Sequence, residues 1–300
     1  MTDRTWVGGG NNNANRASHW SPDGVPQPGD TLEMQAGTMN IRGDDLAGDT
    51  LVINKPTTET APTTLNLSRH AVVSLSESPF LFDSVTVNVK GSDTLNVQTP
   101  FGGQFTVNLA DHASLAGSFK MAFSSATISG GDGSRYLNNG ASVLEGSPVI
   151  FDTNVGGNGS FTVQSAQSRA GQLEFGGSVS HGQDVEVTGD STRGIGSQVK
   201  LDHPDAFKGS VGLGVYGEVD LVGLANADSF QLKNDILSIY SGCEVIDQLR
   251  LTLPAYSGQD PGLTVRQTAA GVAVARGISN FGTGTLLPEH QPHGWGNVQV

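Results

Sequence analysis

Residues 85–109 read VTVNVKGSDTLNVQTPFGGQFTVNL, and this stretch decides the fold. It contains three short runs, 85–89, 94–97 and 105–109, in which apolar and polar residues alternate. Alternation with a period of two is the pattern of a β-strand that buries one face. Gly, Ser, Asp and Pro stand between the runs and favour turns. The stretch therefore predicts short strands joined by tight turns.

The same pattern covers most of the chain and predicts an all-β fold. The only helical candidate, residues 202–207, is too short for a stable helix. Glycine supplies 41 of the 300 residues, which suits a chain that turns often. Further alternating runs lie at 51–53, 64–67, 71–75, 161–163, 184–187, 229–232, 249–253 and 272–275.

A β-sandwich or barrel and a parallel β-solenoid both fit this rhythm of short strands. The solenoid is favoured because outward positions repeat Asn and Thr, which stack into ladders when coils lie in register. We predict a single-stranded parallel β-helix of about ten coils. The lack of a strict residue repeat favours the right-handed kind. The predicted ladder residues are Asn66, Asn88, Asn96, Asn108, Thr86, Thr94 and Thr106.

The two ends of the chain differ from its middle, which suggests three segments. We predict an N-terminal cap at 1–30, the β-solenoid at 31–276 and a C-terminal tail at 277–300. A solenoid must cover its open ends, because an uncovered coil edge pairs with other chains. Trp6 and Trp20 are the residues expected to plug the first coil. Trp295 lies in the tail, and all three are expected to contact neighbouring molecules if the protein assembles.

The first forty residues carry a motif that allows one comparison with known proteins. Residues 6–11 read WVGGGN, residues 17–20 read ASHW and residues 24–32 read GVPQPGDTL. This resembles the opening W-x-G-G…N-W…G-x-P-x-x-G-D-x-V of large bacterial surface proteins with β-helical, adhesin-type passenger regions. His19 stands where that motif has Asn. The resemblance covers about a tenth of the chain and implies a β-helical architecture with a role in adhesion, scaffolding or assembly.

The rest of the chain is similar, in architecture alone, to β-solenoid filament formers such as bactofilins. The resemblance implies a structural role and no defined reaction. We therefore expect a non-enzymatic protein that self-assembles into filaments or a scaffold layer, with itself as partner. A carbohydrate-binding, adhesin-like module is the alternative, with a polysaccharide as partner, and a polysaccharide lyase or hydrolase is the third possibility.

The charge balance restricts the partners of the chain. It carries 16 Lys and Arg against 29 Asp and Glu, for a net charge of −13. Nucleic acids and anionic membranes require clustered basic residues, so neither is expected as a partner. Cys243 is the single cysteine, which rules out an internal disulfide, and its surroundings suggest a packing role. No cofactor is expected.

The start of the sequence bears on localisation. Residues 1–6 read MTDRTW and contain no apolar segment of a secretory signal, and no run of 18 apolar residues follows. We expect no signal peptide and no membrane span. The protein is expected in the cytoplasm, or at the cell surface by a route that needs no N-terminal signal.

Several groups of polar residues are candidates for catalytic or metal-binding sites. For each of them, a turn or a solvated surface is the favoured interpretation. They are the acids Asp44, Asp45 and Asp49, the group Asp202, His203 and Asp205, and the pair His181 and Asp184. The pattern Gly212-x-Gly214-x-x-Gly217 precedes a strand, so it lacks the helix that binds a dinucleotide phosphate. One copy of GGDG at 130–133 falls short of a repeated calcium site. His290 and His293 belong to the predicted tail. No catalytic, cofactor or metal residue is assigned.

Overall fold

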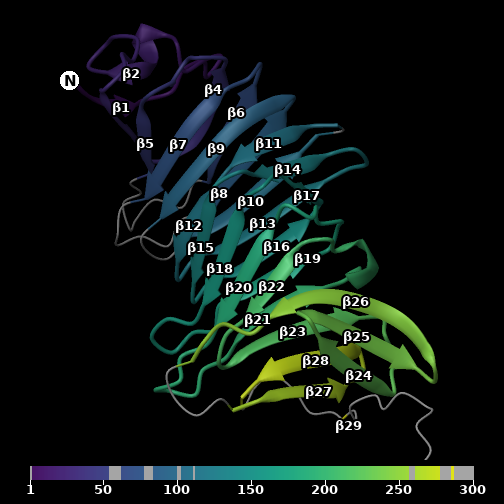
Figure 1. Cartoon of the computed structure of the whole chain (residues 1–300). Coiled ribbons are helices and arrows are strands. Elements are labelled where there is room, and N and C mark those ends of the chain that lie inside the picture. The colour runs from purple at the N-terminus through teal and green to yellow at the C-terminus, as the bar shows by residue number, and fades with distance from the viewer. Residues whose placement is uncertain are drawn as a thin grey trace, which may run out of the picture.

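The computed structural model describes residues 2–53, 62–77, 84–99, 103–110, 112–256, 261–277 and 285–286. Over these residues the chain is a β-solenoid of about eight turns (Figure 1). The all-β and solenoid predictions are confirmed, and the prediction of ten coils is too high. Two causes explain the difference. Successive coils use 20 to 26 residues, and the C-terminal strands form hairpins instead of coils.

Each coil places its strands in two sheets that enclose the core. Sheet A has 17 strands. They are β1 (Asp3–Trp6), β2 (Trp20–Ser21), β3 (Thr31–Met34), β5 (Thr50–Ile53), β7 (Val72–Glu77), β9 (Ser92–Thr99), β11 (Ser114–Gly117), β12 (Phe119–Ala122), β14 (Arg135–Asn138), β15 (Ala141–Glu145), β17 (Asn154–Gly156), β18 (Ser160–Gln164), β20 (Asp184–Thr188), β22 (Ser210–Leu213), β24 (Ser229–Lys233), β25 (Ile236–Ser241) and β26 (Glu244–Thr252).

Sheet B has 12 strands. They are β4 (Gly37–Arg42), β6 (Thr63–Ser68), β8 (Ser84–Lys90), β10 (Gln104–Leu109), β13 (Ser125–Gly130), β16 (Pro148–Asp152), β19 (Gln172–Phe175), β21 (Ser197–Leu201), β23 (Gly217–Val222), β27 (Leu263–Gln267), β28 (Gly271–Arg276) and β29 (Thr285–Leu286). Two single-turn 3-10 helices, η1 (Ala17–His19) and η2 (Pro204–Ala206), lie in connections.

The strands stack in parallel because every coil repeats the same inward and outward alternation. Val87 on β8 lies opposite Leu65 on β6 and Val107 on β10, and all three are buried. A slip by one residue would turn every apolar side chain to solvent, so burial fixes the register. Each such side chain contributes about 1.5–3 kcal/mol when fully buried. Register is therefore kept although coil lengths differ.

Aromatic side chains fill the core of the middle coils. Phe119 on β12 and Tyr136 on β14 pack from sheet A against Phe151 on β16 of sheet B, and the rings of Tyr136 and Phe151 stack with centroids 4.9 Å apart. Phe151 continues the column to Phe175 at 5.9 Å. These rings are almost fully buried, which explains why a chain with few aromatic residues leaves hardly any on its described surface.

Candidate functional site

The N-terminal residues lie over the first coil and cover its edge in both sheets. Strand β1 pairs with β3 in parallel and with β2 antiparallel, while Ala14 donates its backbone N–H to the carbonyl of Asn40 on β4. Trp20 is fully buried and donates from Nε1 to the carbonyl of Ala14 at 2.7 Å. Trp6 packs edge-on against Trp20, with centroids 5.2 Å apart. Both tryptophans thus lie inside this end, and neither presents its ring to a neighbouring molecule.

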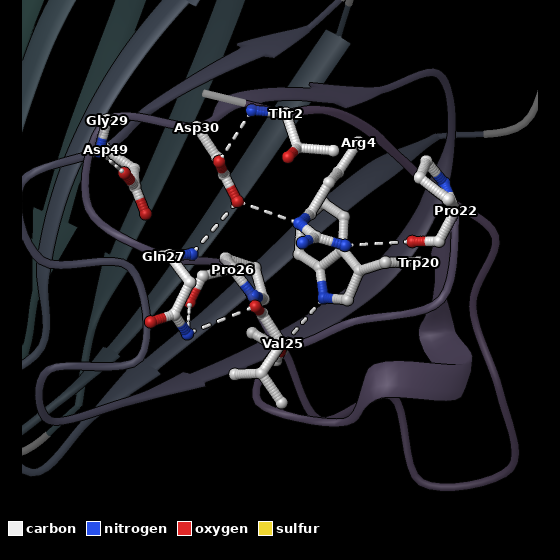
Figure 2. A network of polar contacts seen from close by, with 11 residues as sticks. Thr2, Arg4, Trp20, Pro22, Val25, Pro26, Gln27, Gly29, Asp30 and Asp49 are labelled. Carbon is white, nitrogen blue, oxygen red and sulfur yellow. Dashed lines mark hydrogen bonds and ion pairs between the residues drawn. The ribbon is translucent and has the colours of Figure 1, made fainter.

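The P-x-x-G-D part of the motif holds this segment in place (Figure 2). The Asp30 carboxylate accepts from the backbone N–H of Thr2 at 2.8 Å, from Arg4 Nε at 2.8 Å and from the N–H of Gln27 at 3.1 Å. The Arg4 hydrogen bond, followed by the two backbone donors, lowers the pKa of Asp30 to about 2. Gly29, at φ +90°, donates its N–H to Asp49 at 2.8 Å. The motif therefore ties the first strand to the first coil.

The C-terminal end of the solenoid is covered by antiparallel strands. In sheet A, β26 follows β22 in parallel and then pairs with β25, which pairs with β24. In sheet B, β28 lies antiparallel on β23 and pairs with β27. Figure 1 shows these hairpins below the last parallel coils. The predicted solenoid segment 31–276 thus contains hairpins after its last parallel coil.

A regular polar surface runs across the N-terminal coils of sheet B, and we call it the Thr–Asn face. One outward column is made of threonines in register: Thr38, Thr64, Thr86, Thr106 and Thr127. The second column, two residues along each strand, is Asn40, Asn66, Asn88 and Asn108. Neighbouring members of a column are separated by the interstrand spacing of about 4.8 Å.

The asparagine column is a hydrogen-bonded ladder. Asn66 Nδ2 donates to Asn40 Oδ1 at 2.8 Å, Asn88 to Asn66 at 2.8 Å and Asn108 to Asn88 at 2.9 Å. The first member, Asn40, donates to the carbonyl of Asn11 in the cap at 2.8 Å. A side-chain amide has two N–H donors and two acceptor lone pairs. Asn66 and Asn88 therefore each keep one donor and one lone pair that this ladder does not use.

Part of the predicted ladder is confirmed and part is wrong. Asn66, Asn88, Asn108, Thr86 and Thr106 stack as expected. Asn96 and Thr94 lie on β9 in sheet A, where Asn96 pairs with Ser74 and Thr94 with Val72. The pattern Thr-x-Asn therefore occurs in strands of both sheets. The alternation of apolar and polar residues does not show which sheet a strand joins. Sequence reasoning also missed Asn40 and the outer threonines Thr38, Thr64 and Thr127.

A groove of about 520 Å³ runs along the edge of this face. The asparagine column forms one wall, and the side chains at the ends of the same strands form the other. That second column is Arg42, Ser68, Lys90 and Ala110. The floor is formed by Leu67, Val89 and Leu109. Because it crosses four coils, the groove suits an elongated ligand that lies along the solenoid axis.

A second groove, of about 400 Å³, lies on sheet A at the C-terminal half. Asp184 and Glu186 on β20 both line it, and the Ser210 hydroxyl donates to Asp184. Both carboxylates come from one strand. The third possibility, a polysaccharide-cleaving enzyme, would be supported by carboxylates that come from separate coils and converge in one groove. This groove does not supply that arrangement.

The other polar groups considered in the sequence lie in turns, where some of them accept hydrogen bonds from the backbone, or lie apart from one another. Asp45 accepts from the N–H of Arg42, and Pro204 begins η2, so these segments are turns. Gly212 lies in β22 and Gly217 begins β23, which confirms that this glycine pattern precedes a strand. Cys243 is exposed in the turn between β25 and β26, so the packing role expected for it is wrong.

The GGDG segment lines a small polar hollow of about 180 Å³ with Asp152 and Asn154 from the next coil. Among the residues described, no three His, Cys, Asp or Glu side chains gather as a metal site would require. Trp295, His290 and His293 lie outside the described residues.

Sheet B carries charged side chains on its C-terminal coils in place of Thr and Asn. Arg266 on β27 reaches across β28 and donates to Glu218 on β23 at 2.5 Å. Gln198 donates to the neighbouring Asp220 at 2.6 Å. Burial, and then the nearby Glu218 carboxylate, raise the pKa of Asp220 to about 6. These contacts tie the last parallel strand to the hairpin that covers it.

Comparison with family models, curated proteins and solved structures found no match to this chain. None of the helices in the described ranges is long and apolar enough to cross a bilayer.

Proposed function

We propose that this protein is a non-enzymatic, adhesin-like module that binds an extended polysaccharide along the Thr–Asn face. The observation that carries the proposal is the groove lined by the asparagine ladder. Amide groups that recur at each coil offer one donor and one acceptor at every step, which suits a polymer that repeats its hydroxyl groups. We place this activity at a cell surface, where such polymers occur.

The chemistry of the face supports a polar ligand. Its exposed atoms are amides and hydroxyls held on rigid strands, so little conformational entropy is lost on binding. Hydrogen bonds to single sugars contribute only about 0.5–1.5 kcal/mol each, because both partners leave water. Several coils bound at once to one chain raise the affinity through effective concentration. The protein is therefore expected to bind long chains better than short oligosaccharides.

The test is binding to a panel of polysaccharides by affinity electrophoresis. The double variant Asn66→Thr/Asn88→Thr removes two amides while keeping residues that favour strands. We expect it to lose binding by about tenfold, a loss of 1.4 kcal/mol spread over two sites. The control is Asn96→Thr, which makes the same change on sheet A and should bind as the parent does. No binding to any polysaccharide, or equal loss in both variants, would refute the proposal.

Lateral self-association is the second candidate, and it is the function favoured by the sequence. Its specific support is that Thr and Asn ladders of constant spacing also pair with copies of themselves in stacked sheets. Covered ends disfavour end-to-end stacking, so assembly would use a sheet face. Negative-stain electron microscopy over a concentration series, with and without calcium, tests it. Ordered filaments or sheets would support assembly, whereas separate particles at every concentration would exclude it.

A further inference from the structure

The groove beside the asparagine ladder has an unusual charge for this protein. The whole chain has a net charge of −13. Among the described residues that line the groove there are two cations, Arg42 and Lys90, and no carboxylate. A wall that is locally positive in an acidic protein attracts anions over a range set by ionic strength, about 10 Å at 0.1 M salt.

The two cations are spaced by the solenoid itself. Arg42 at the end of β4 lies in register with Ser68, and Ser68 with Lys90 at the end of β8. Two coil steps therefore separate them, about 10 Å along the axis. Both side chains are exposed. The acids nearest in sequence are Asp44 and Asp45 beside Arg42 and Asp93 beside Lys90, and none of them lines the groove. The Asp45 carboxylate accepts from the Arg42 backbone N–H, and burial raises the pKa of Asp45, which the charge of Arg42 acts to lower.

We infer that the groove selects a polysaccharide that carries carboxylates. This inference rests on the proposed polysaccharide binding and names its substrate class. The Arg42 guanidinium and the Lys90 ammonium bind carboxylates of the polymer, while Asn66 and Asn88 on the facing wall bind its hydroxyls. The cations lie on one wall and the amides on the other, so an extended chain contacts both along its length.

The composition of the groove favours a sugar polymer over a nucleic acid. Proteins that hold single-stranded nucleic acid combine positive charge with aromatic side chains on which bases stack. The described lining contains no aromatic residue. Amide side chains along the groove suit hydroxyl groups, because each amide offers a donor and an acceptor close together. Single-stranded DNA is therefore the appropriate polyanion control.

The experiment uses the full chain and three probes of similar length. They are a β-1,4-linked glucose oligomer, a uronic acid oligomer and single-stranded DNA, titrated by calorimetry at about 20 mM and 200 mM salt. We expect the uronate oligomer to bind most tightly, with an affinity that falls at the higher salt. The neutral oligomer should bind more weakly and without salt dependence, and the DNA should bind weakly or not at all.

Charge variants locate the effect. Arg42→Gln and Lys90→Gln should each weaken uronate binding about three- to tenfold at low salt, as expected for partly exposed ion pairs. Because both side chains line the groove, binding of the neutral oligomer should also change, but clearly less than binding of the uronate, since the neutral oligomer offers no carboxylate to either cation. The matched controls Arg250→Gln and Lys233→Gln remove exposed cations from the C-terminal hairpins and should have no effect. Because these side chains are exposed, all four variants should keep the parent melting temperature.

The outcomes separate this inference from the proposed function. Equal affinity for neutral and uronate oligomers would overturn the charge selection and leave polysaccharide binding intact. Failure of both sugars to bind would overturn the proposed function as well. Equal binding of uronate and DNA would show that charge alone is recognised, which also overturns the inference. A loss in the control variants as large as in Arg42→Gln would place the site elsewhere.

Discussion

Two aspartates at opposite ends of the solenoid illustrate how surroundings set the properties of one residue type. Asp30 accepts three N–H donors, one of them from Arg4, and these hold its pKa near 2. Asp220 is half-buried beside Glu218, and its pKa rises to about 6. The first carboxylate favours the folded state when it is charged, whereas the second favours it when protonated. At neutral pH the charged Asp30 therefore stabilises the N-terminal cap, whereas the charged Asp220 destabilises the C-terminal coil.

Replacing Asp220 with Asn should stabilise the protein at neutral pH. In the parent, the folded state binds a proton more tightly than the unfolded state, whose Asp titrates near 3.8. Stability therefore falls as the pH rises from about 4 to about 6 and is constant above that. Asn keeps an acceptor for Gln198 and carries no charge, so we expect a gain of about 1–2 kcal/mol at pH 7.

Thermal unfolding followed by circular dichroism between pH 4 and pH 8 measures this effect. The control Asp235→Asn makes the same chemical change in the exposed turn between β24 and β25 and should follow the parent. A parent and an Asp220→Asn variant with equal melting temperatures at pH 7 would contradict the assignment.

At the scale of elements, the alternation of apolar and polar residues predicts which segments are strands, but it does not predict how those strands pair. The runs around Val87 and Val107 are strands because only one face of each is apolar, and this is visible in the residues. That Arg42 and Lys90 share one wall is not visible in the sequence, because two coils of unequal length separate them along the chain. The hairpins of β24 to β28 were also missed, since a strand in a hairpin alternates in the same way as a strand in a coil.

Glycines at the bends of the coils give an element-scale prediction. Gly117 is the last residue of β11, at φ +151°, and a Cβ atom there would lie 1.8 Å from the carbonyl oxygen of Leu95 on the neighbouring coil. Gly91, at φ +110°, has open space around the same position. Gly91→Ala should cost about 1 kcal/mol from backbone strain alone. Gly117→Ala should cost about 3 kcal/mol or more, because two coils must also separate.

Urea denaturation of both variants measures the two costs. The difference between them isolates the contact between coils, because both replacements put Ala at a positive φ. Equal midpoints for Gly117→Ala and Gly91→Ala would show that the coils can move apart freely, contrary to the packing described for this region.

At the scale of the whole molecule, the solenoid is a stack in which each coil contacts only its neighbours. Such a stack is stable only if its ends are covered, because an open coil presents a row of unpaired N–H and C=O groups. Here β1 and β2 with Ala14 cover one end, and the hairpins of β24 to β28 cover the other. The sequence indicated the first cover through its tryptophans and its P-x-x-G-D motif.

Deletion of residues 2–30 should convert the protein into an aggregating one. The loss would expose the edges of β3 and β4 together with the apolar surface now covered by Trp6 and Trp20. We expect light scattering that rises with concentration and a fibril signal with an amyloid dye, because exposed parallel edges template further strands. A deleted protein that stays monomeric at concentrations where the parent does would show that the cap is dispensable for solubility.

In the asparagine ladder, the spacing between successive coils does not depend on the number of residues in each coil. Successive rungs lie 26, 22 and 20 residues apart in the chain, yet each is joined to the next by the same amide hydrogen bond of 2.8–2.9 Å. The variation in coil length therefore lies in the segments that connect one strand to the next. A peptide inserted in a connection between two strands should therefore leave the spacing of the ladder unchanged. The molecule could then display foreign loops at fixed, known distances along its axis.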